Sequence, residues 1–180
     1  MQPRVGFAEL EQWPEDGLRY ELYDGEVCVV PTPMPRHQRI VLEVAKHLDA
    51  YAAMHGGEAL VSPIDIVFSE YDVLQPDVVF FQASRRHLIT PDKAIRSAPD
   101  LAVEVLSPST AGRDRGRKMQ IFARYGVTEY WIIDPPARSV EIFWLNGKTL
   151  VPGQSISASG MVTSTVLPEL QFPAAALFRE

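Results

Sequence analysis

The chain has 180 residues, of which 46% are hydrophobic and 22% charged, a balance typical of a soluble globular protein of one domain. No apolar segment approaches the roughly 20 residues of a membrane-spanning helix, and the first residues lack the basic start and apolar core of a signal peptide. The single cysteine, Cys28, excludes an intrachain disulfide and a cysteine-based zinc site, so we expect a cytoplasmic protein.

The net charge of −6 argues weakly against a nucleic-acid partner, because nonspecific binding to a polyanion depends on Lys and Arg. Local basic clusters can override the total charge. Two such clusters occur, Arg85-Arg86-His87 and the group of Arg113, Arg115, Arg117 and Lys118. The total charge alone therefore does not decide the kind of partner.

The N-terminal third predicts a hairpin and a helix. Residues 19–30 form two short apolar segments around Asp24-Gly25, a strong signal for a two-residue turn. Residues 37–54 place apolar side chains at helical spacing, and Gly56-Gly57 ends this predicted amphipathic helix.

The middle of the chain predicts strands. We expect two of them near residues 59–68 and 73–81, separated by a polar stretch, followed by an irregular or partly helical segment over 82–99. The segment 101–106 is apolar on both faces, which predicts a central strand of the sheet.

The last third predicts a helix over 112–125 closed by Gly126, a second hairpin over 129–145, and short strands and turns over 146–180. The order of strands and helices predicts an α/β or α+β fold with one mixed sheet and a helix packed on it. We expect one domain over residues 1–180, with a core over about 18–145 and the short C-terminal strands after it.

Glu104 is the most informative residue, because it is an acid inside an apolar strand. A carboxylate buried there costs several kcal/mol unless it is paired or binds a metal. One interpretation is a buried ion pair with Arg or Lys. The other is a functional site, since acids within strands are uncommon.

Two further acids, Asp77 and Asp100, each follow a proline and precede an apolar strand. Asp100 and Glu104 are four residues apart on one strand, so about 13 Å separates their Cα atoms and they cannot share one cation. Asp77 comes from a different strand and can approach Glu104 laterally, because neighbouring strands lie about 5 Å apart. Asp77 is the better partner, although an acid after proline can also be a simple turn residue.

Two carboxylates on neighbouring strands suit Mg²⁺ or Mn²⁺, which bind oxygen ligands, and the carbonyl of Val105 is a natural third ligand. Lys118 lies fourteen residues beyond Glu104, on the following helix. A lysine near such a cation can orient or deprotonate an attacking water and stabilise charge on a phosphate. The alternative for Lys118 is a solvent-exposed ion pair with Asp114, four residues earlier.

Several motifs resemble the Uma-type family of restriction endonucleases, which belongs to the PD-(D/E)xK restriction-endonuclease-like superfamily. The resemblance covers about residues 18–178. It is carried by Tyr20-Glu21-Leu22-Tyr23-Asp24-Gly25-Glu26, Pro35-Arg36-His37-Gln38, Pro76-Asp77, Glu104-Val105-Leu106-Ser107-Pro108-Ser109-Thr110, Asp114-Arg115-Gly116-Arg117-Lys118 and Tyr125-Gly126-Val127-x-Glu129-Tyr130-Trp131.

The resemblance implies a restriction-endonuclease-like mixed β-sheet flanked by helices, with DNA as substrate and a homodimer as the functional unit. It implies that Asp77 and Glu104 bind the metal and that Lys118 is the catalytic lysine. The sequence departs from the superfamily pattern, because the position two residues after the glutamate is Leu106 rather than lysine. Glu21 is a further candidate metal ligand, with a cross-strand ion pair as its alternative.

We therefore expect a Mg²⁺- or Mn²⁺-dependent endonuclease that hydrolyses phosphodiester bonds in DNA. The first alternative is a catalytically degenerate module of the same fold that binds nucleic acid or protein without cutting. The second is a two-carboxylate hydrolase of the glycosidase type, which needs no lysine and would keep its activity in EDTA.

Overall fold

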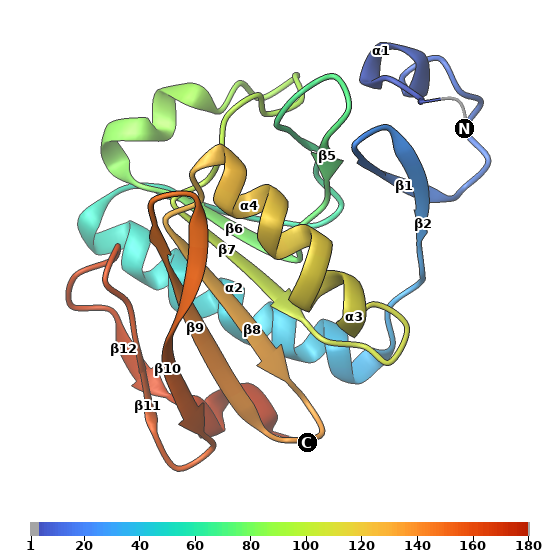
Figure 1. Cartoon of the computed structure of the whole chain (residues 1–180). Coiled ribbons are helices and arrows are strands. Elements are labelled where there is room, and N and C mark those ends of the chain that lie inside the picture. The colour runs from blue at the N-terminus through green and yellow to red at the C-terminus, as the bar shows by residue number, and fades with distance from the viewer. Residues whose placement is uncertain (1–3, 180) are drawn as a thin grey trace.

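A six-stranded sheet forms the centre of the computed structural model, which describes residues 4–179 (Figure 1). Its order is β10-β9-β8-β7-β6-β3, and every neighbouring pair is antiparallel except β7–β8. Its strands are β3 (Glu58–Val61), β6 (Val78–Phe81), β7 (Leu101–Val105), β8 (Glu129–Asp134), β9 (Ser139–Asn146) and β10 (Thr149–Ser157).

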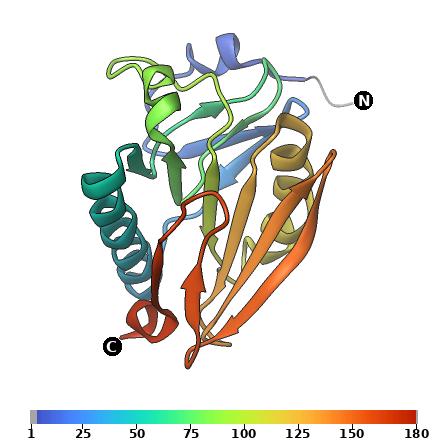
Figure 2. The ribbon, with the colours of Figure 1, turned by 90° about the vertical axis from the view of Figure 1, so that its left-hand side faces the viewer.

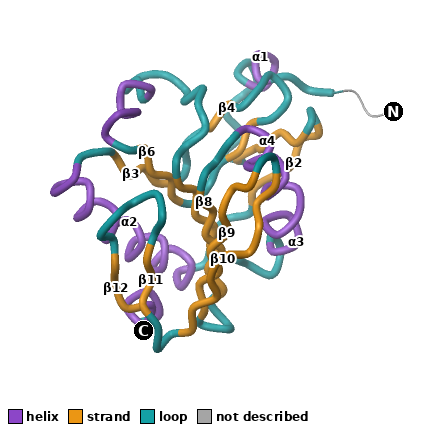
Figure 3. The backbone as a smooth tube through the Cα atoms, turned by 60° about the vertical axis from the view of Figure 1, so that its left-hand side comes forward, coloured by secondary structure: helices purple, strands orange, loops and turns teal. Residues whose placement is uncertain are grey.

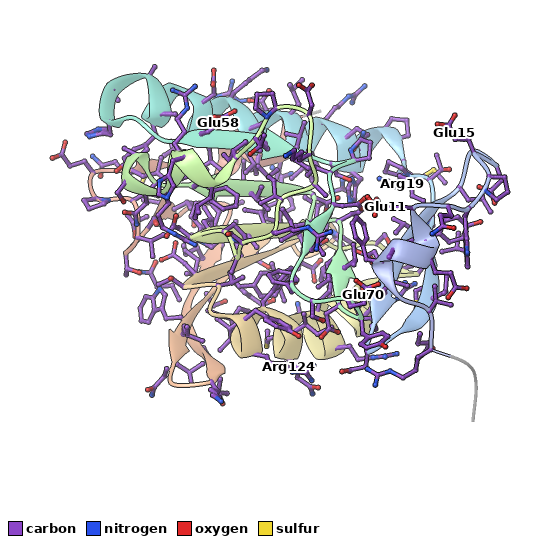
Figure 4. The ribbon with its side chains drawn as sticks, turned by 90° about the horizontal axis from the view of Figure 1, so that it is seen from above. Glu11, Glu15, Arg19, Glu58, Glu70 and Arg124 are labelled. Atoms are coloured by element: carbon purple, nitrogen blue, oxygen red, sulfur yellow. The ribbon has the colours of Figure 1, made fainter. Side chains whose placement is uncertain are left out.

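Helices cover both faces of this sheet. Helix α2 lies on one face, and a helical segment of three parts lies on the other (Figure 2). Seen from above, α4, which carries Arg124, runs along the side of the sheet opposite to α2 (Figure 4). The helices are α1 (Phe7–Leu10), α2 (Pro35–His55), η1 (Ala83–Leu88), α3 (Ala111–Arg113), η2 (Asp114–Lys118), α4 (Met119–Tyr125) and η3 (Ala174–Phe178).

Two smaller sheets complete the fold. The N-terminal sheet has the order β2-β1-β5-β4, and the C-terminal pair β11–β12 lies beside α2 (Figure 3). Their strands are β1 (Arg19–Tyr23), β2 (Glu26–Val30), β4 (Ile66–Val67), β5 (Val73–Leu74), β11 (Met161–Thr163) and β12 (Gln171–Pro173). Within residues 4–179, no helix is both long enough and apolar enough to cross a membrane.

The alternation of side chains along β7 divides the core into two layers. Leu101, Val103 and Val105 pack with α2, whereas Ala102 and Leu106 pack with α4. Because side chains alternate across a strand, Glu104 points to the α4 face. The sheet therefore directs this acid toward the helical segment that carries Lys118.

Most predicted elements are confirmed, including the mixed α+β fold and the central position of β7 between β6 and β8. The first hairpin turns where predicted, with Asp24 and Gly25 both at positive φ, as a type I′ turn requires. The second hairpin, β8–β9, also forms as predicted. The predicted helix over 112–125 contains a π-helical turn, η2, that the periodicity did not reveal.

Three predicted strands differ from the structure. Each of the two strands predicted over 59–68 and 73–81 is divided, because the chain crosses from one sheet to the other at residues 62–65 and again at 75–77. The expectation of short strands after residue 146 is wrong for β10, which has nine residues and pairs with β9. The two crossings bring the N-terminal sheet against the end of β7, where the candidate site lies.

Candidate active site

A cavity of about 620 Å³ opens where the N-terminal sheet meets the end of β7. All five predicted site residues line it, and they come from four different segments of the chain. These residues are Glu21, Asp77, Glu104, Val105 and Lys118. The structure therefore brings together the five residues that the sequence analysis proposed for the site.

Glu104 and Lys118 form the centre of the site. Lys118 Nζ donates a hydrogen bond of 2.6 Å to Glu104 Oε1, and the two side chains are only about 5% exposed. Lys118 ends the π-helical turn η2, a type of helix irregularity that often occurs at functional sites. The lysine therefore reaches the acid from the helix rather than from β7, as the family resemblance implies.

Glu21 holds Lys118 from the opposite side. Its Oε1 lies 3.0 Å from Lys118 Nζ and accepts the backbone N–H of Gln75 at 2.8 Å, while its Oε2 accepts the hydroxyl of Tyr23 at 2.7 Å. The predicted cross-strand ion pair is therefore wrong, since the cation comes from η2. Direct metal ligation by Glu21 stays a prediction, and both of its oxygens already accept hydrogen bonds.

Asp77 joins the site from the start of β6. Its Oδ2 accepts the backbone N–H of Val105 at 2.8 Å and lies 3.1 Å from His37 Nε2. The Val105 N–H has no partner in β6 because the β6–β7 ladder ends at Val78 and Val103. Asp77 thus fills a gap in the ladder and is fixed beside Glu104, as the lateral arrangement of strands predicts.

Asp114 is a further acid of the cavity, and its predicted exposed ion pair with Lys118 is wrong. Both side chains are buried, with 3.9 Å between Asp114 Oδ1 and Lys118 Nζ. Asp114 Oδ2 is buried without a hydrogen-bond partner among residues 4–179. An unsatisfied buried carboxylate oxygen is costly, so this position favours a further positive group in the cavity.

The charges at the buried centre of the cavity do not balance. Three buried carboxylates, those of Glu21, Glu104 and Asp114, surround one buried basic group, Lys118. The other basic residues of the lining are half-buried or exposed, and they are Arg19, Arg36, His37 and Arg113. Burial raises the pKa of Glu104 well above its usual range, against the opposing effect of Lys118. Burial also raises the pKa of Asp114. The excess of carboxylates makes this buried centre a favourable place for a cation.

Lys118 remains protonated in this environment. Burial alone would lower its pKa, but the carboxylates of Glu104 and Glu21 outweigh that effect, so the pKa lies well above the usual value. A lysine held this way donates hydrogen bonds and does not accept a proton. The sequence analysis allowed Lys118 to orient an attacking water and stabilise charge on a phosphate, or to deprotonate the water as a base. The structure fits the first role better than the second.

His37 is a site residue that the sequence analysis did not single out. It lies in the first turn of α2 and contacts the carboxylate of Asp77. Burial would lower the pKa of His37, but the hydrogen bond and charge of Asp77 outweigh it and raise the pKa. The only sequence signal was its place in the motif Pro35-Arg36-His37-Gln38, at the predicted start of a helix.

The carboxylate oxygens of Asp77 and Glu104 are suitable ligands for a small divalent cation. Asp77 Oδ1 and Glu104 Oε2 accept no hydrogen bond from residues 4–179, so each acid keeps one free oxygen at the cavity. Hard cations such as Mg²⁺ use one or two carboxylates together with waters. Within the same residues, no three His, Cys, Asp or Glu side chains converge as a ready-made metal cluster.

Comparison with known proteins places this chain in a family. The model of the Uma2 family, described as "Putative restriction endonuclease", matches residues 7–175. The chain belongs to the Uma2 family. The predicted family is thereby confirmed, and its description supports a nuclease-like, hydrolytic function.

Two similar proteins extend this comparison. The Uma2 chain is 25% identical over 153 residues to the uncharacterized protein slr1290 of Synechocystis sp., covering 80% of this chain and 76% of that protein. It also superposes on the crystal structure of a protein from Anabaena variabilis that is described as "a putative nuclease belonging to DUF820". The TM-score is 0.79 with 19% identity, and 97% of each chain is covered. At that identity the likeness shows the fold.

Asp100 lies outside the cavity of this Uma2 chain. Its carboxylate accepts hydrogen bonds from Arg85 and from the backbone N–H of Gln82, so it fastens η1 to the sheet. The distance argument had favoured Asp77 over Asp100 as the partner of Glu104. The position of Asp100 outside the cavity is consistent with that argument. Arg86, in the same basic cluster as Arg85, pairs with Glu58.

Proposed function

We propose that this chain is a Mg²⁺- or Mn²⁺-dependent endonuclease that hydrolyses phosphodiester bonds in DNA. The observation that carries the proposal is the buried Glu104–Lys118 pair in an open cavity, whose buried centre holds three carboxylates and one basic group. A purely structural ion pair needs no cavity and no excess of acids. Membership of the Uma2 family supports the same reaction class.

Asp77 and Glu104 are the residues that would hold the cation, through the oxygens that accept no hydrogen bond, with the Val105 carbonyl as a third donor. When bound, the cation would supply Lewis-acid activation of the phosphate and of a water molecule. The protein contributes a fixed arrangement, because the Val105 N–H orients Asp77 and Lys118 orients Glu104. Such pre-organisation of donors and charges is a major source of rate enhancement.

Lys118 would stabilise the negative charge that develops on the phosphate. Its ammonium group has three donors. One of them forms a hydrogen bond with Glu104, and Glu21 forms an ion pair with the ammonium group at 3.0 Å. The remaining donor capacity of Lys118 would serve an oxygen of the substrate phosphate. The proposed homodimer would place two such sites on the two strands of a duplex.

A cleavage assay tests the proposal. Purified wild type, Asp77→Asn and Lys118→Ala are incubated with plasmid and single-stranded DNA in Mg²⁺, in Mn²⁺ and in EDTA. We expect cutting by wild type only with the cation, and loss of cutting in both variants by about 100-fold or more, the scale of one lost catalytic group.

Asp100→Asn is the matched control, because Asp100 also follows a proline at the start of a strand but lies outside the cavity. It should cut like wild type for equal amounts of folded protein. Cutting that survives EDTA would favour the two-carboxylate hydrolase instead. DNA binding without cutting would favour the degenerate binding module.

A further inference from the structure

A second, smaller pocket of about 170 Å³ lies at the start of α2 and is walled mainly by arginines. Its lining residues are Arg36, Arg39, Ile40, Arg138, Leu177, Phe178 and Arg179. No acid is among them. We call the group of Arg36, Arg39, Arg138 and Arg179 the arginine pocket.

The four arginines are unpaired within residues 4–179, since none of them forms a salt bridge there. The arginines that do pair lie elsewhere, at positions 85, 86, 115, 117 and 124. Glu43, whose carboxylate interacts with Arg179, is already bound to Lys46 at 2.7 Å. In a chain of net charge −6, this concentration of positive charge is a local exception.

Two of these side chains are held in place by their neighbours. Arg36 donates a hydrogen bond of 2.7 Å to the carbonyl of Pro135, and Arg138 lies 5.9 Å from the ring centre of Phe178. The C-terminal end of the described chain lies beside the β8–β9 turn, which brings Arg138 and Arg179 together (Figure 1). Arginines held this way lose less side-chain entropy on binding an anion.

The arginine pocket adjoins the active-site cavity. Arg36 lines both, and Pro135, which accepts its hydrogen bond, lines the cavity. Arg36 and Arg39 are three residues apart on α2 and therefore share one face of the helix. A polymeric ligand that extends from the cavity past Pro135 would therefore contact these guanidinium groups.

We propose that the arginine pocket binds backbone phosphates of the nucleic-acid strand next to the bond that lies in the cavity. This inference rests on the proposed function and names a binding site for its substrate. Guanidinium groups match phosphate oxygens in two-pronged hydrogen bonds. Contacts of this kind fix the position of the strand and do not depend on its base sequence.

The test measures binding without cleavage. Fluorescence anisotropy follows the binding of labelled single-stranded and duplex oligonucleotides in EDTA over a range of KCl concentrations. The proteins are wild type, Arg39→Gln, Arg138→Gln and the double variant. Lys148→Gln is the matched control, because it removes the same charge from the β9–β10 turn. Arg39 is exposed on a helix, so its variant is expected to fold, which circular dichroism checks.

We expect each arginine variant to weaken binding by about five- to tenfold, equally for different base sequences. The slope of log K against log salt should decrease by about 0.7–0.9 for each lost contact. Lys148→Gln should keep both the affinity and the slope of wild type. Equal affinities and slopes for all four proteins would overturn the proposal.

Three other outcomes also decide the proposal. If inorganic phosphate raises the Tm of wild type but not of the double variant, and nucleic-acid affinity is unchanged, the pocket holds a small anion and the strand proposal is wrong. If wild type cuts DNA while the arginine variants bind it normally, the arginine proposal fails and the proposed function stands. If wild type binds no nucleic acid, both fail.

Discussion

Two buried glutamates on neighbouring strands, Glu129 on β8 and Glu104 on β7, occupy opposite kinds of site. Glu129 is fully buried, and both of its oxygens accept hydrogen bonds. The donors are Trp131 Nε1 at 2.7 Å, the Thr165 N–H at 2.9 Å and the Thr165 hydroxyl at 2.6 Å. Glu104 has a partner for one oxygen and faces a cavity with the other.

The difference separates an acid that stabilises the fold from one that is available for chemistry. The surroundings of Glu129 complete its hydrogen bonding and fasten the loop at Thr165 to the sheet. The surroundings of Glu104 add further acids, so burial and its neighbours raise its pKa. Burial alone is therefore a poor guide to function, and incomplete pairing next to a cavity is a better one.

The largest effect that tests this comparison is on cleavage. We expect Glu104→Gln to lower the rate by at least about 100-fold, because the amide removes a charge from the proposed cation site. Glu129→Gln should keep the rate per folded molecule but lower the free energy of unfolding by about 1–3 kcal/mol, since its amide N–H₂ faces donors. Cleavage rates and urea unfolding of both variants provide the measurement.

The next effect is on stability. Lys118→Met leaves Glu104 and Glu21 buried without their cation, so we expect it to lower the free energy of unfolding by about 3–5 kcal/mol. Adding Glu104→Gln to that variant should recover part of the loss, because one buried charge is removed. A double-mutant cycle in urea measures the coupling, and strictly additive losses would contradict the pairing.

The pH dependence of Mn²⁺ binding follows from the raised pKa of Glu104. Below that pKa the acid carries a proton that the cation must displace, so affinity should rise as pH rises, by up to about tenfold per pH unit for one displaced proton. Calorimetric titrations in buffers of different ionisation enthalpy should show proton release. An affinity that stays constant from acidic to neutral pH would contradict this account.

The smallest effect concerns the hydroxyl groups that hold the two kinds of acid. Tyr23→Phe removes the donor to Glu21, and Thr165→Val removes one donor to Glu129, so each should cost about 1 kcal/mol of stability. Only Tyr23→Phe should also slow cleavage, since Glu21 positions Lys118. Steady-state kinetics distinguish the two, and equal rates for both variants would argue against a positioning role of Glu21.

The sequence predicted those parts of the site that depend on local pattern. Glu104 stood out because an acid interrupts an apolar strand, and strand spacing selected Asp77 over Asp100 as its neighbour. The hairpin turn at Asp24-Gly25 and the central position of β7 followed from equally local signals. Lys118 was a candidate from its place on the following helix, and the family resemblance implied its catalytic role, although it lies far from the usual position of the lysine.

Other features depend on long-range contacts that no local pattern encodes. The burial of Asp114 and Lys118 comes from the π-helical turn, which changes the direction of side chains within an otherwise ordinary helical sequence. Glu21 reaches Lys118 because the two crossings bring the N-terminal sheet against the end of β7, and His37 reaches Asp77 from the first turn of α2. The arginine pocket joins residues from the start of α2, the β8–β9 turn and the C-terminal segment.

Crystals grown or soaked with Mn²⁺ provide the most direct test of the central claim, because anomalous scattering locates the ion independently of activity. The account predicts one peak per chain in the cavity, next to Asp77 Oδ1 and Glu104 Oε2, and no peak at Glu129. Glu104→Gln crystals should lose the peak. A cavity without an ion in wild type, or an unchanged peak in Glu104→Gln, would contradict the assignment of Glu104 as a metal ligand.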